Sequence, residues 1–93
     1  MPIGLLTLEL HLPHAHSLKE KRLVLRRIKD RLRARFNVAV AELDHQDLWQ
    51  RAVVGVVSIS SDRASLETML EAVQRESEKL LGRDLLAAEL DVL

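Results

Sequence analysis

The chain has 93 residues, of which 47% are hydrophobic and 30% are charged, so its composition is that of one folded domain rather than a disordered segment. It contains no cysteine, which excludes disulfides and thiolate metal sites. No charged leader with an apolar segment opens the chain, and its apolar runs are far shorter than the roughly 18 residues that span a bilayer, so we expect a cytoplasmic protein without membrane contact or cofactor.

The charges are balanced in number but not in position. Nine of the fourteen basic residues fall between Ser17 and Phe36, where only Glu20 and Asp30 oppose them, which gives this segment a net charge of +7. The rest of the chain carries a net charge of −7. A molecule divided in this way binds a polyanion with one side, or binds the acidic half of another copy.

The first two predicted elements are a strand and a helix. Residues 3–12 alternate between two faces, which predicts a strand with Leu6, Leu8, Leu10 and Leu12 on its core face. Ser17 and Glu20 form a capping box that begins a helix, and an apolar stripe runs along this helix from Leu18 to Phe36.

The remaining chain predicts three strands and one helix. The strands cover residues 37–43, 51–60 and 84–93, and the helix covers residues 62–81. The strand over 51–60 is apolar on both faces, which is typical of a central strand. The helix is capped by Asp62 and followed by Gly82, a residue suited to a helix C-terminus.

This β-α-β-β-α-β order predicts an α+β fold, the ferredoxin-like sandwich, formed as a single domain over residues 1–93. Its four-stranded antiparallel sheet has two helices on one face and leaves the other face open. We expect the open face to carry Ile3, Leu5, Leu85 and Ala87, together with one side of the third strand.

Four segments carry a resemblance to a known family: SLKEKR at 17–22, ARFNVAVAE at 34–42, DLWQRAVVG at 47–55 and VSISSD at 57–62. In these segments the sequence resembles the small bacterial YlxP-like family, a domain of unknown function often encoded near translation-initiation and ribosome-maturation genes. The resemblance implies a ferredoxin-like fold and an association with ribosome assembly or RNA. It implies no catalytic residues.

The exposed side of the first helix is the predicted RNA-binding surface. At helical spacing its cations form one basic ridge: Lys19, Arg22, Arg26, Lys29 and Arg33. Guanidinium groups pair with phosphate oxygens, and each neutralised phosphate releases counterions, so this ridge favours a structured RNA or the ribosome as partner. The alternatives are an ordinary solvated face or a protein-interaction module that contacts acidic protein surfaces. Lys21 and Arg35 lie nearer the apolar stripe, and we interpret them as structural charges.

A second candidate surface is a protein interface on the open sheet face. Its predicted members are Ile3, Leu5, Leu85 and Ala87, with Trp49 as an anchor on a neighbouring loop. We therefore expect a homodimer or other homo-oligomer. A slip of one residue in the assigned strand faces would make this patch smaller.

Catalysis and metal binding find little support in the sequence. There is no nucleophile with a partner and no glycine-rich phosphate loop, so we expect a non-enzymatic protein. His11, His14 and His16 have a spacing that zinc accepts, but histidines on a loop without fixed supporting groups are more typical of polar loop residues, and we predict no metal site.

Overall fold

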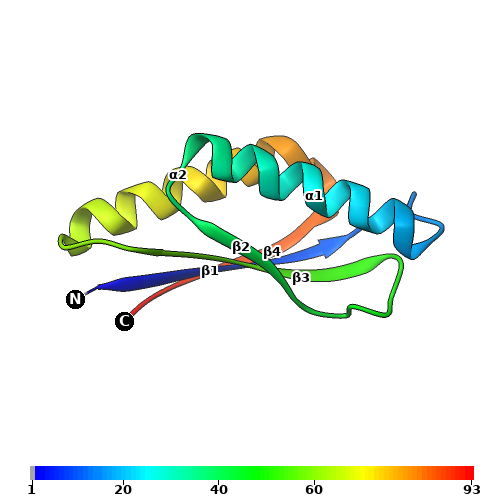
Figure 1. The fold of residues 1–93 in the computed structure, drawn as a ribbon, viewed down its shortest axis with the longest axis horizontal. Helices are drawn as coiled ribbons and strands as arrows, with labels where there is room; N and C mark the ends of the chain where they lie inside the picture. The colour runs from blue at the N-terminus through cyan, green and yellow to red at the C-terminus, as the bar shows by residue number, and fades with distance from the viewer. Residues whose placement is uncertain (1) are drawn as a thin grey trace.

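One antiparallel sheet carries both helices on a single face, and its other face is uncovered (Figure 1). The computed structural model describes residues 2–93. Its elements are β1 (Ile3–His11), α1 (Leu18–Arg35), β2 (Ala39–Asp44), β3 (Arg51–Ile59), α2 (Arg63–Leu81), a 3₁₀ turn (Gly82–Asp84) and β4 (Leu85–Val92). The strand order β2-β3-β1-β4 places β1 and β3 in the centre and confirms the predicted ferredoxin-like α+β fold.

The core lies between the central strands and the two helices. Leu6, Leu8 and Leu10 of β1 are fully buried and stand opposite Val56, Val54 and Ala52 of β3. The helices supply the other layer of the core: Ile28, Leu32, Leu66, Leu70 and Val73. Each fully buried aliphatic side chain of this kind contributes roughly 1.5–3 kcal/mol, so the alternating leucines of β1 fix which face of the sheet the helices cover.

Both helices begin at the capping residues that the sequence indicates. The Ser17 hydroxyl accepts a hydrogen bond from the Glu20 backbone N–H at 3.1 Å. The Glu20 carboxylate accepts in return from the N–H of His16 at 2.7 Å, one residue earlier than the reciprocal bond of a standard capping box. Asp62 caps α2 by accepting from the Ser65 backbone N–H at 3.2 Å.

The C-terminal strand differs from its prediction in one respect that matters for the open face. The register between β1 and β4 shifts between Glu9 and Leu10, which places Leu85 opposite Leu10. Leu10 faces the helices, so Leu85 packs against the core, and its predicted place on the open face is wrong. A β-bulge causes this change because it adds one residue to one strand and reverses the alternation beyond it.

Two further features concern the turn before β4 and the two helices. The 3₁₀ turn before β4 begins at Gly82, whose φ of 54° lies in the region that favours glycine. Among residues 2–93, neither helix is both long enough and apolar enough to cross a membrane.

Candidate functional site

The basic residues of α1 fall into two sets that differ in their partners. One set is engaged in ion pairs with acidic residues elsewhere in the fold: Lys21, Arg31 and Arg35. The other contains six cations without an ion pair among residues 2–93: the five residues of the predicted ridge, Lys19, Arg22, Arg26, Lys29 and Arg33, and also Arg27, which lies outside that ridge. The structure thus separates cations that stabilise the domain from cations that remain available to a partner.

Lys21 is a buried structural charge, as the sequence indicated. Only 1% of its side chain is exposed, and its Nζ lies 2.6 Å from Oε2 of Glu42 on β2, a close ion pair rather than a well-aligned hydrogen bond. The same Nζ donates to the backbone carbonyls of His45 at 2.6 Å and Leu48 at 2.7 Å. Lys21 therefore joins the first turn of α1 to β2 and to the loop that follows it.

Arg31 and Arg35 are held by the second helix. Both pair with the buried carboxylate of Glu76 on α2, at 3.4 Å for Arg31 Nε and 2.7 Å for Arg35 Nη1. The interpretation of Arg35 as a structural charge is consistent with this contact. These pairs engage both guanidinium groups with one carboxylate on the side of α1 that faces α2.

The five ridge cations are all exposed, and none of them forms an ion pair within residues 2–93. They do not form one uniform outward ridge, however. Arg22, Arg26 and Lys29 line a groove between α1 and the edge strand β2, whereas Lys19 and Arg33 lie outside that groove. The sequence predicted that these cations share one side of α1. It did not predict the groove beside them, because the opposite wall of the groove is formed by residues 40–42 of β2.

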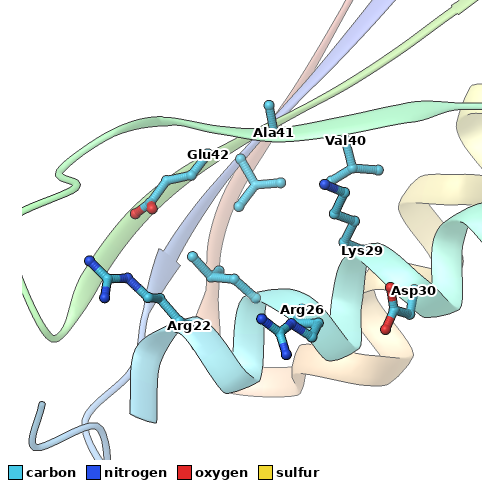
Figure 2. A pocket seen from close by; sticks show the side chains of 9 residues that line it. Arg22, Arg26, Lys29, Asp30, Val40, Ala41 and Glu42 are labelled. Carbon is cyan, nitrogen blue, oxygen red and sulfur yellow. The ribbon is translucent and has the colours of Figure 1, made fainter. Parts of the chain in front are cut away.

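The groove has a volume of about 370 Å³, and its walls differ in charge and polarity. The three cations stand on α1, and Lys29 extends toward Val40 of β2 (Figure 2). Apolar side chains form the floor: Leu25, Val40 and Val54. Two carboxylates also line the groove, those of Asp30 and Glu42. Since Glu42 is neutralised by Lys21, the groove retains an excess of positive charge.

The open sheet face carries an apolar cluster of two cross-strand pairs. Ile3 stands opposite Ile59, and Leu5 stands opposite Val57. Ile3, Val57 and Ile59 are 40%, 38% and 51% exposed. The sequence had pointed to Ile3, Leu5 and the valine-rich third strand, and the strand register brings these residues together.

The other predicted interface residues lie apart from this open-face cluster. Ala87 is exposed at the other end of the face, opposite Glu9, and Trp49 is exposed on the loop between β2 and β3. Leu85 belongs to the core, as described above. Of the five predicted interface residues, Ile3 and Leu5 therefore lie in the open-face cluster. Leu85, Ala87 and Trp49 lie outside it.

The histidines do not assemble into a site. His14 and His16 are exposed on the loop after β1, while His11 ends that strand. Across residues 2–93 no group of three or more His, Asp or Glu side chains lies close enough to hold a metal ion. The backbone carbonyl of His45 has a structural role, because it accepts a hydrogen bond from Lys21.

Comparison with known proteins places the chain in a family. Residues 3–89 match the family described as "Protein of unknown function (DUF503)". This chain belongs to the DUF503 family. It is 44% identical over 71 residues to the "Uncharacterized protein YlxP" of Bacillus subtilis (strain 168), an alignment that covers 76% of this chain and 77% of that protein. The predicted YlxP-like membership is thereby confirmed.

The fold of this DUF503 chain also has a counterpart among solved structures. The de novo designed protein Foldit4 aligns with it at a TM-score of 0.57, covering 99% of this chain and 94% of that protein at 17% sequence identity. At this identity the likeness concerns the arrangement of helices and strands alone. The likeness therefore carries no information about the chemistry of the α1 cations.

Proposed function

We propose that this DUF503 protein is a non-enzymatic domain that binds RNA, free or within the ribosome, through the basic face of α1. The observation that carries the proposal is the division of the α1 cations. Lys21, Arg31 and Arg35 are used inside the fold, yet six exposed cations of the same helix, the five ridge residues and Arg27, have no acidic partner among residues 2–93.

Repulsion among the exposed α1 cations favours a bound ligand over a merely solvated face. Exposed cations on one side of a helix repel one another, and a helix that needed them only for solubility would usually intersperse acidic residues. Arg22, Arg26 and Lys29 converge instead on one groove, where only Asp30 and the already paired Glu42 oppose them. Phosphate groups are a chemically suitable partner, since guanidinium groups bind their oxygens in pairs.

The test is RNA binding measured by fluorescence anisotropy as a function of salt. If four phosphates are engaged, the logarithm of the association constant should fall against the logarithm of salt concentration with a slope of about −3 to −4. Reversal of Arg22, Arg26 and Arg33 to Glu should abolish binding while the circular dichroism spectrum stays unchanged, because these side chains are exposed.

A matched control separates local binding from net charge. Reversal of Arg75, Lys79 and Arg83 to Glu changes the net charge by the same amount at exposed positions outside α1. This control variant should keep most of its affinity. No binding to any RNA at low salt, or equal losses in the two triple variants, would overturn the proposal. Binding to polyglutamate but not to RNA would instead identify the basic face as a contact for acidic proteins.

We also propose that two copies associate through the open sheet face. The cluster of Ile3, Leu5, Val57 and Ile59 is apolar, and exposed apolar patches of this kind mark interaction sites. The same face carries both signs of charge nearer the other end of β1, where Glu9 and Arg51 lie 3.9 Å apart. A face with an apolar cluster and charges of both signs can complement a second copy of itself about a twofold axis.

A further inference from the structure

We infer that the groove between α1 and β2 binds a single-stranded RNA segment, with phosphates on the α1 cations and a base on the apolar floor. This inference rests on the proposed RNA-binding function and specifies the form of RNA that the site accepts. It follows from the shape and lining of the groove, whereas the proposed function follows from the unpaired charges.

The positions of the cations argue against contact with a duplex alone. A double helix presents its phosphates on a convex surface, and shape-directed recognition of it needs cations that project outward. Arg22, Arg26 and Lys29 line a hollow instead, beside β2. A flexible single strand can enter such a hollow and place successive phosphates along α1.

The floor of the groove suits a base rather than a phosphate. Leu25 is partly exposed, and Val40 and Val54 lie below it in the core. A phosphate gains nothing from aliphatic carbon, but an unstacked base has apolar faces that must be covered when it leaves its neighbours. The groove therefore offers one surface for each part of a nucleotide.

The far wall of the groove supplies polar groups for the edge of the base. Within residues 2–93, β2 is an edge strand that pairs only with β3, so every second residue of β2 directs its backbone N–H and C=O away from the sheet. Glu42 adds a carboxylate on the same wall (Figure 2). A carboxylate accepts hydrogen bonds and donates none, so it favours bases that carry an exocyclic amino group.

Cytosine and uracil make a matched pair for this preference, because at position 4 of the same ring one carries an amino group and the other a carbonyl oxygen. We expect oligocytidylate to bind about two- to thirteenfold more tightly than oligouridylate of the same length, the range given by one net hydrogen bond. Comparison of bases is preferable to substitution of Glu42, since loss of this carboxylate would leave Lys21 buried without its ion partner.

The decisive experiment compares one mixed-sequence RNA strand, alone and annealed to its complement, by fluorescence anisotropy with the full chain. The single strand should bind at least about tenfold more tightly than the duplex. Leu25→Gln replaces the apolar floor with a polar amide of similar volume and keeps every charge, so it should reduce single-strand affinity to the duplex level and leave duplex affinity unchanged. Because this variant can perturb packing, a 4-thiouridine strand crosslinked to the unmodified protein gives a second measurement, with adducts expected in residues 22–29 and 39–42.

The outcomes separate this inference from the function on which it rests. Equal affinities for single strand and duplex, or crosslinks confined to Lys19, Arg33 and the outer face of α1, would overturn the groove as a single-strand site and leave RNA binding by α1 intact. Equal affinities for the two homopolymers would overturn the role given to Glu42. Failure of both single strand and duplex to bind at low salt would overturn the proposed function together with the inference.

Discussion

Replacement of Lys21 by methionine should strongly destabilise the domain, although Lys21 belongs to a helix whose other cations are largely exposed. Its Nζ makes three contacts, with Glu42 and with the carbonyls of His45 and Leu48. Methionine fills a similar volume but can replace none of them. The variant would leave one carboxylate and two carbonyl groups without their partner.

The expected loss can be estimated from these contacts. Removal of one member of a buried ion pair costs about 3–5 kcal/mol, because the remaining charge stays desolvated. The Glu42 side chain keeps 21% exposure, so water solvates it in part, and the lower end of that range, about 3 kcal/mol, applies. A domain of this size has a total stability of about 5–15 kcal/mol. The variant should therefore lose a substantial fraction of its stability.

Urea unfolding followed by circular dichroism measures this loss. Lys19→Met is the matched control, since Lys19 is exposed two residues earlier, and it should change the free energy of unfolding by no more than about 0.5 kcal/mol. Lys21→Met combined with Glu42→Gln should be more stable than Lys21→Met alone, because no unpaired charge remains. A Lys21→Met protein as stable as the Lys19→Met control would show that the contacts of Lys21 do not stabilise the domain.

Two further predictions concern the second helix and the open face. Hydrogen bonds from Ser65 hold the pKa of Asp62 below its usual value, so its ionised form stabilises the fold above about pH 4, and this contribution is lost as pH falls through the lowered pKa. Asp62→Asn retains a cap acceptor without the titration, and the difference in melting temperature between wild type and variant should shrink on acidification; a difference that grows would contradict the assignment. Ile59→Glu should shift the protein toward monomer in sedimentation velocity by burying a charge in the proposed interface, and a wild type that is already monomeric at high micromolar concentration would exclude that interface.

Much of the fold follows from local patterns in the sequence. The alternation of Leu6, Leu8 and Leu10 and the capping residues Ser17 and Asp62 are short-range signals, and the structure confirms them. The orientation of Leu85 does not follow from such signals. It depends on a register shift between two strands that are far apart in the sequence, and an alternating pattern contains no information about a bulge in its partner.

The candidate site, too, could be predicted from the sequence only in part. Helical spacing placed Arg22, Arg26 and Lys29 on one side of α1, but the groove needs β2 as its second wall. Proximity to the apolar stripe separated Lys21 from the ridge. The carbonyl groups that accept hydrogen bonds from Lys21 could not be predicted from the sequence. They belong to residues 24 and 27 positions away, and they are backbone groups that every sequence provides.

The burial of Lys21 also gives the molecule a chemical reporter of its own local motions. The chain has three other lysines, Lys19, Lys29 and Lys79, and all three are exposed to amine-reactive reagents. Lys21 can react only when the start of α1 separates from the loop after β2, because burial and its contacts otherwise shield the amine. Its labelling rate relative to Lys19 therefore measures how often this end of the groove opens in the folded protein.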